Sequence, residues 1–217
     1  MDERNAGTGY LVRPASLPAP GVLVLHPWWG LTDDVREVSD RLADAGFVVL
    51  APDLFEGQTA DDPEAGERLL GSADPNRLAH ITRSSLHTLH TLDAVRGLPV
   101  GVVGLSMGAS LALWLSARVP EQVDAVSVFY GVQDFDLAEI AAPVQGHFAE
   151  HDVHVDPDQV VLLEAELDLG GNVYEFHRYA GTAHWFAEPS RPEYDEDAAA
   201  LAWTRLVGFL DRHLRPE

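Results

Sequence analysis

The chain has 217 residues, of which 46% are hydrophobic, so it is long enough to bury a core and too apolar for a disordered protein. Its formal net charge is -21 at pH 7, so nucleic acids and anionic membrane surfaces are unfavourable partners. The absence of cysteine excludes disulfides, thiolate metal sites and a cysteine nucleophile.

The hydropathy pattern indicates neither a membrane segment nor a targeting segment. No apolar run approaches the ~20 residues that a membrane helix needs. The polar start at residues 1–5 lacks the apolar core of a signal peptide. We therefore expect a cytoplasmic protein, present as a monomer or a homodimer.

The first half of the chain alternates strand-length apolar runs with helical patterns. Residues 21–25 form a continuous apolar run that predicts a buried strand, and residues 35–45 repeat apolar side chains at helical spacing. A second buried strand is expected at residues 47–51. Residues 53–74 are polar and rich in Gly, Asp and Glu, so we expect an excursion over the surface. A long helix is predicted to follow, over residues 75–95.

The second half continues this alternation without a repeat or a linker. The predicted elements, in chain order, are strand 99–105, helix 109–118, strands 123–130 and 144–149, helix 156–169, strand 173–177 and helix 195–214. Strands that alternate with helices are typical of a parallel sheet. We therefore predict a single α/β domain spanning residues 1–217, with a mostly parallel central sheet and helices on both faces.

A Gly-x-Ser-x-Gly sequence, from Gly104 to Gly108, joins a predicted strand to a predicted helix. A nucleophile on so tight a turn has a strained backbone, and glycine on both sides relieves the crowding. The free N–H groups at the start of the helix face the reacting oxygen. In this context the motif predicts Ser106 as the nucleophile of an α/β-hydrolase fold, against the alternative of a structural turn with a solvent-facing serine.

A serine nucleophile needs a base, and the base needs an acid that orients it. In this fold the chain order is nucleophile, acid, base, so both partners must follow Ser106. Asp152, directly after the strand 144–149, is the predicted acid, and Asp134, after an earlier strand, is the alternative. Asp156 is expected to cap the helix that it begins.

The loop after the last predicted strand supplies the predicted base. His184 lies in the sequence Gly-Thr-Ala-His-Trp-Phe, between that strand and the terminal helix. Two other histidines compete for this role. His177 falls inside a strand pattern and His213 on the final helix, so a structural role is expected for both.

Acyl transfer also needs two N–H donors for the oxyanion. The backbone of Met107, directly after the nucleophile, is one candidate, and that of Trp28, after the first buried strand, is the other. The tryptophans that flank the proposed site predict an aromatic pocket for neutral aryl or short acyl esters. The residues expected to line this pocket are His26, Trp29, Trp185 and Glu188.

Several segments together resemble the dienelactone hydrolase family. They are residues 26–31, 51–55, 104–108, 151–155 and 181–186, which cover nearly the whole chain in the family's order. The resemblance implies a compact α/β-hydrolase with a minimal lid. We expect no cofactor. It also implies Ser106, Asp152 and His184 in the triad positions, with the backbone of Trp28 and Met107 in the oxyanion hole.

Three departures from the family bear on the substrate. Dienelactone hydrolases proper use a cysteine nucleophile, where this chain has Ser106. Pro27 stands in the place of their glutamate near the resting thiol. Glu188 stands where they carry an arginine for the substrate carboxylate. These differences favour a general esterase for neutral small-molecule esters or lactones over one for anionic dienelactones.

Three alternatives stay open at this stage. Thioesterase and peptidase reactions can use the same triad, because the fold does not fix the leaving group. A non-catalytic binding protein could retain the fold. Histidines and carboxylates within ten residues could also hold zinc or manganese, although their spacing lacks a helical ligand pair. These residues are His147, His151, Asp152, His154 and Asp156.

Overall fold

The computed structural model describes residues 9–132 and 137–215. Its strands are β1 (Gly9–Val12), β2 (Gly21–Leu25), β3 (Val48–Pro52), β4 (Val100–Leu105), β5 (Ala125–Phe129), β6 (Val144–His151) and β7 (Tyr174–Ala183). Its α-helices are α1 (Asp33–Asp44), α2 (Pro63–Ser72), α3 (Pro75–Thr91), α4 (Met107–Arg118), α5 (Pro157–Gly170) and α6 (Glu196–Leu214), with a short 3-10 helix at Pro120–Gln122.

The strands form one sheet in the order β1-β3-β2-β4-β5-β6-β7. All neighbouring pairs are parallel except β1 and β3, which run antiparallel. The register sets Leu25 of β2 beside Gly104 of β4, and Leu105 beside Phe129 of β5. The carboxyl ends of these central strands therefore meet at one edge, and the predicted mostly parallel sheet is confirmed.

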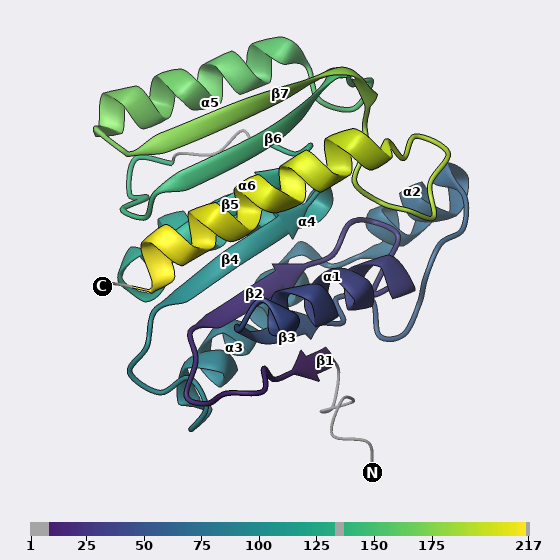
Figure 1. The fold of residues 1–217 in the computed structure, drawn as a ribbon. Coiled ribbons are helices and arrows are strands. Elements are labelled where there is room, and N and C mark those ends of the chain that lie inside the picture. The colour runs from purple at the N-terminus through teal and green to yellow at the C-terminus, as the bar shows by residue number, and fades with distance from the viewer. Residues whose placement is uncertain (1–8, 133–136, 216–217) are drawn as a thin grey trace.

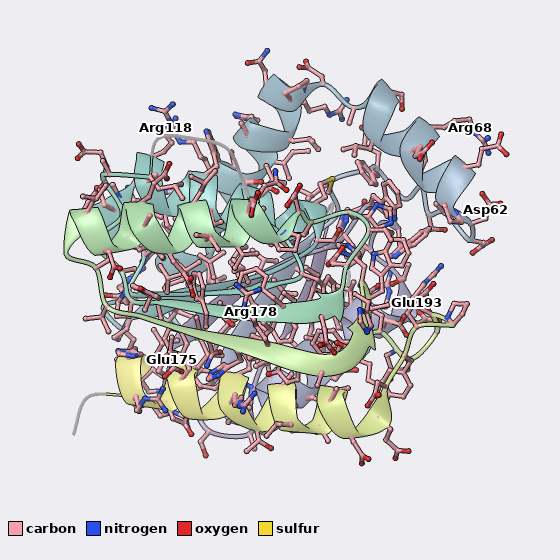
Figure 2. The ribbon with its side chains drawn as sticks, turned by 90° about the horizontal axis from the view of Figure 1, so that it is seen from above. Asp62, Arg68, Arg118, Glu175, Arg178 and Glu193 are labelled. Carbon is pink, nitrogen blue, oxygen red and sulfur yellow. The ribbon has the colours of Figure 1, made fainter. Side chains whose placement is uncertain are left out.

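Helices cover both faces of the sheet, and alternate strand residues define the two layers. Leu23, Val102 and Val126 face the cluster formed with α3, α4 and α5. Val22 and Val103 face the cluster formed with α1 and α6. Figure 2 shows α5 and α6 on opposite sides of the strands. Strands buried on both faces have continuous apolar sequences, which is why the sequence pattern located them.

One strand and one α-helix of the structure were absent from the sequence-based prediction. Strand β1 precedes the first predicted strand and pairs with β3 at the edge of the sheet (Figure 1). Helix α2 lies within the expected excursion 53–74, where the Asp62 side chain caps it by accepting from the Ala65 N–H. Gly66 is its only fully buried residue, with Ala65 and Leu69 half-buried against the core, and the Asp, Glu and Gly residues around them give the segment the composition of a loop.

Strand β7 is also longer than predicted, because it continues from Tyr174 to Ala183 and ends directly before His184. Within the described ranges, no helix is long and apolar enough to cross a bilayer. Because β4, β6 and β7 run parallel in one sheet, the loops that follow them lie at the same end of the sheet.

Candidate active site

Ser106 occupies the sharp turn between β4 and α4. Its backbone has φ 51° and ψ -113°, in the region of positive φ that side chains rarely adopt. A Cβ at Gly104 would lie 2.3 Å from the Gly108 carbonyl oxygen, and one at Gly108 would lie 2.0 Å from the Leu25 carbonyl oxygen. The Ser106 N–H donates to the Phe129 carbonyl at 2.9 Å. The turn is therefore fixed against both β2 and β5.

A histidine and an aspartate extend from this serine in a hydrogen-bonded chain. The Ser106 Oγ lies 2.9 Å from the Nε2 of His184, with which it hydrogen-bonds. The Nδ1–H of His184 donates to Asp152, at 2.7 Å from Oδ2 and 2.9 Å from Oδ1. The side chains of His184 and Asp152 are 3% and 6% exposed, so the pair is shielded from water. Three residues separated by 32 or more positions thus meet at one point.

Local backbone donors hold Asp152 in this orientation. Its Oδ1 accepts from the N–H groups of His154 at 2.8 Å and Val155 at 3.0 Å. Asp156 has another role: its side chain accepts from the Asp158 N–H and forms a capping box at the start of α5. The alternative acid, Asp134, lies outside the described residues. Of the described candidates, Asp152 is the one bonded to His184.

The two competing histidines lie away from the serine. His177 is on β7, where its ring lies 5.5 Å from that of His147. His213 is on α6 and packs against Phe209.

The suggested metal ligands do not converge: among residues 9–132 and 137–215, no group of three or more His, Asp or Glu side chains is arranged to hold a metal ion.

A cleft of about 340 Å³ opens beside Ser106, and we call it the serine cleft. Its lining residues are Trp28, Leu70, Leu78, Ser106, Met107, Ser110, Leu111, His154, His184 and Trp185. Most of these side chains are apolar or aromatic. The polar side chains are two serines and two histidines, and the Ser110 hydroxyl already donates to the Val132 carbonyl. The cleft therefore offers an apolar surface around the Ser106 hydroxyl.

The two expected oxyanion donors both belong to residues of this lining. Met107 is the first residue of α4, where a backbone N–H has no acceptor within the helix. Trp28 lies in the loop after β2, and no described residue accepts a hydrogen bond from its backbone N–H.

The structure corrects the expected pocket lining, because only Trp185 of the four residues borders the serine cleft. His26 is fully buried: its Nδ1–H donates to the Pro27 carbonyl at 2.7 Å, and its Nε2 accepts from the Leu54 N–H at 3.0 Å. Burial lowers the pKa of His26 to about 4, so its ring is neutral at pH 7. His26 ties the loop after β2 to that after β3.

Trp29 and Glu188 are also turned into the protein. Trp29 is 1% exposed and packs beneath Trp28 and Trp185, with ring centroids 5.4 and 4.9 Å away. Glu188 is 2% exposed and accepts a hydrogen bond of 2.8 Å from the Tyr130 hydroxyl. Because Trp29 and Glu188 lie in loops near Ser106, the sequence indicated that both residues are close to the site. The direction in which each side chain points depends on the turns of its own loop.

Other residues of the cleft were missed by the sequence reasoning. Leu70 and Leu78 come from α2 and α3, a segment that carried no active-site signal. His154 was considered only as a metal ligand, yet its ring lies 4.8 Å from that of His184 and 4.9 Å from that of Trp185. Its place two residues after Asp152 was the available signal for this.

The parallel sheet, the serine turn after a central strand and the histidine after the last strand define a protein of the α/β-hydrolase class. The chain matches the model of the Dienelactone hydrolase family over residues 8–214. The chain therefore belongs to this family, and it is an enzyme that hydrolyses ester or lactone bonds.

Curated relatives and solved structures agree with this assignment. The chain is 31% identical over 216 residues to the protein usf of Aquifex pyrophilus, covering 95% of this chain and 93% of the relative. It is 30% identical over 212 residues to a carboxymethylenebutenolidase of Pseudomonas putida, covering 91% and 87%. A dienelactone hydrolase-like promiscuous phosphotriesterase from metagenomic libraries is 25% identical, with a TM-score of 0.82 and coverage of 94% and 92%. The dienelactone hydrolase of Anabaena variabilis shares the fold, at 22% identity and a TM-score of 0.70, covering 95% and 92%.

Proposed function

We propose that this chain is a serine hydrolase that cleaves carboxylic esters through an acyl-enzyme on Ser106. The observation that carries the proposal is the hydrogen-bonded chain from the Ser106 Oγ through His184 to Asp152, with distances of 2.9 and 2.7 Å. A nucleophile in contact with a base that is itself oriented by a carboxylate is the arrangement that acyl transfer requires.

The proposed reaction has two halves that use the same groups. The Nε2 of His184 accepts the Ser106 proton as Oγ bonds to the carbonyl carbon, and the N–H groups of Met107 and Trp28 stabilise the oxyanion. The tetrahedral intermediate collapses, and the alcohol leaves with the proton from His184. A water molecule then attacks the acyl-enzyme, gives its proton to His184, and releases the acid and the free serine. Asp152 orients the imidazole and stabilises its charged form in both halves.

The lining of the serine cleft supports neutral esters with short acyl or aryl groups as substrates. No arginine is among its lining residues, and the protein carries a net charge of -21 at pH 7. A substrate carboxylate would therefore lose its hydration without gaining a cationic partner. The rings of Trp28 and Trp185 and the side chains of Leu78 and Leu111 offer apolar contacts instead.

A panel of substrates on wild type and Ser106→Ala tests this proposal. We expect hydrolysis of p-nitrophenyl acetate and butyrate by the wild type and its loss in the variant. A fluorophosphonate probe should label the wild type at Ser106 and leave the variant unlabelled. Faster turnover of a carboxylate-bearing lactone than of the neutral esters would contradict the proposed substrate class. Ester hydrolysis that survives Ser106→Ala would contradict the proposed nucleophile.

A further inference from the structure

A buried tyrosine–glutamate pair joins the loop of residues 184–195, which we call the base loop, to the end of the strand beside Ser106. Tyr130 directly follows β5, is fully buried, and donates its hydroxyl proton to the Glu188 Oε1 at 2.8 Å. The residue before it, Phe129, accepts the Ser106 N–H. The Tyr130 ring centroid lies 5.0 Å from that of His184. One side chain thus contacts the imidazole and also anchors the loop that follows it.

The loop beyond His184 consists of successive turns. The Glu188 N–H donates to the Trp185 carbonyl at 2.9 Å, and the Arg191 N–H donates to the Glu188 carbonyl at 3.0 Å. Trp185 itself has a positive φ of 67°. The Ser190 hydroxyl is hydrogen-bonded to Asp34 of α1. Glu188 is thus joined by a backbone hydrogen bond to Trp185, the residue that follows His184.

Glu188 is held in this place as an uncharged acid. Its Oε2 is buried and has no hydrogen-bond partner among the described residues. Beside it lies a cavity of about 50 Å³ whose walls include Leu105, Phe129 and Trp203. Burial is the main cause that raises the pKa of Glu188 to about 8, and the charge of Asp34 adds to it. At pH 7 most molecules therefore keep the proton on Glu188.

The charged and titratable groups around Glu188 do not neutralise its ionised form. They are Asp34 and Arg41 from α1, Tyr130 from the end of β5, and Arg191, Glu193 and Tyr194 from its own loop. Arg191 lowers the pKa of Glu188, but its guanidinium lies over the Trp29 ring, 4.1 Å from the centroid. Glu193, labelled in Figure 2 near the end of the base loop, raises that pKa.

We propose that the Tyr130–Glu188 hydrogen bond positions His184 against Ser106, and that loss of the Glu188 proton releases this hold and sets an alkaline limit on hydrolysis. This inference rests on the proposed role of Ser106 and His184. Ionisation would strengthen the bond to one carboxylate oxygen, but it would leave the other charged, buried and without a donor. The loop relieves that cost when it turns the carboxylate toward water, which moves the imidazole.

Two variants separate positioning from simple packing. Glu188→Gln keeps the size and the acceptor for Tyr130, and it mimics the protonated acid without being able to ionise. Tyr130→Phe keeps the ring against His184 and removes the hydrogen bond. Glu196→Gln, an exposed carboxylate at the start of α6, is the matched control for the loss of one charge.

The experiment measures kcat and KM for p-nitrophenyl acetate from pH 6 to 9.5, with spontaneous hydrolysis subtracted. For the wild type and Glu196→Gln we expect kcat to fall with an apparent pKa of about 8, the value raised by burial of Glu188. Glu188→Gln should keep the neutral-pH rate and lose this decline. Tyr130→Phe should lower kcat by about ten- to a hundredfold at pH 7 with little change in KM, because a misplacement of 1 Å costs about 10²-fold.

The outcomes distinguish this inference from the proposed function. An alkaline decline that persists unchanged in Glu188→Gln, or an unchanged kcat in Tyr130→Phe, would overturn the positioning role. Failure of the fluorophosphonate probe to label wild-type Ser106 would overturn the proposed function itself. If Tyr130→Phe does not fold, the comparison of the wild type with Glu188→Gln still decides the question.

Discussion

Gly66 of α2 lies directly against the indole of Trp28. A Cβ at this glycine would be 3.2 Å from three atoms of the ring, closer than ordinary van der Waals contact. Trp28 lines the serine cleft, and its backbone is one of the proposed oxyanion donors. An otherwise exposed helix is therefore in contact with the loop that shapes the site.

Gly66→Leu should displace Trp28 and reduce activity more than stability. A side chain at this position has to push the indole aside, whereas the helix itself gains about 1 kcal/mol when glycine is replaced by a good helix former. We expect kcat/KM for p-nitrophenyl acetate to fall by about tenfold or more. Thermal unfolding should change little. Gly71→Leu, in the same helix and with nothing within 4 Å of its Cβ position, is the control and should retain the activity.

Asp152→Asn should abolish most of the activity without unfolding the protein. The amide can still be buried, but it cannot stabilise the imidazolium, and a loss of about 10³–10⁴-fold in kcat is expected for a triad acid. Asp156→Ala is the contrasting variant. It removes the cap of α5 and should cost about 1 kcal/mol of unfolding free energy while kcat is retained. Equal losses of kcat in both variants would show that Asp152 affects the rate only because it stabilises the folded structure.

His26→Ala should destabilise the protein and change its response to acid. The Leu54 N–H would lose its acceptor, which costs roughly 1–3 kcal/mol. In the wild type the folded pKa of His26 is lowered from 6.5 to about 4, so the unfolded chain binds its proton more readily. Stability is therefore lost as the pH falls from about 6.5 towards 4.

Chemical unfolding of wild type and His26→Ala at pH 7, 5.5 and 4.5 measures this contribution. The difference between the two proteins should shrink as the pH falls. His87→Ala, at an exposed position of α3, is the control and should follow the wild type. A difference that stays constant with pH would contradict the assigned charge state.

Leu70→Arg should shift the substrate preference toward anionic esters. Leu70 lines the serine cleft and is 39% exposed, so an arginine there can place its cation at the mouth without being buried. We expect kcat/KM to rise several-fold for a carboxylate-bearing ester and to stay within about twofold for p-nitrophenyl acetate, because only the anion gains an ion pair. The gain should diminish in 0.5 M salt.

Leu201→Arg separates local from global electrostatics in that experiment. Leu201 is 46% exposed on α6, outside the serine cleft, and the substitution changes the net charge equally. A similar rise of kcat/KM for the anionic ester in both variants would assign the effect to the overall electrostatic field of the protein. It would contradict the idea that the wall of the serine cleft selects the substrate.

The sequence pattern predicted those parts of the site that depend on backbone order. Strand β4 is buried on both faces, so its apolar run, with Gly104 and Gly108 on either side of the turn, located Ser106. The chain order expected for nucleophile, acid and base then led to Asp152 and His184, which the structure brings into a hydrogen-bonded chain with Ser106 because parallel strands end at the same edge of the sheet.

The same reasoning could not predict the direction in which loop side chains point. The positive φ of Trp185 turns the loop so that Glu188 points into the protein toward Tyr130, and no spacing rule reveals that reversal. Helix α2 escaped prediction because it lies in a segment rich in Gly, Asp and Glu and fully buries only Gly66. These features follow from tertiary contacts between segments that are distant in the chain.

The turn at Ser106 also links the proposed catalysis to the assembly of the sheet. A Cβ at Gly108 would collide with the Leu25 carbonyl, and the Ser106 N–H is bonded to Phe129, so the geometry of the turn depends on the alignment of β2, β4 and β5. During refolding, the recovery of fluorophosphonate labelling should therefore report the joining of the three central strands. It would not report the docking of the outlying edge strand β1.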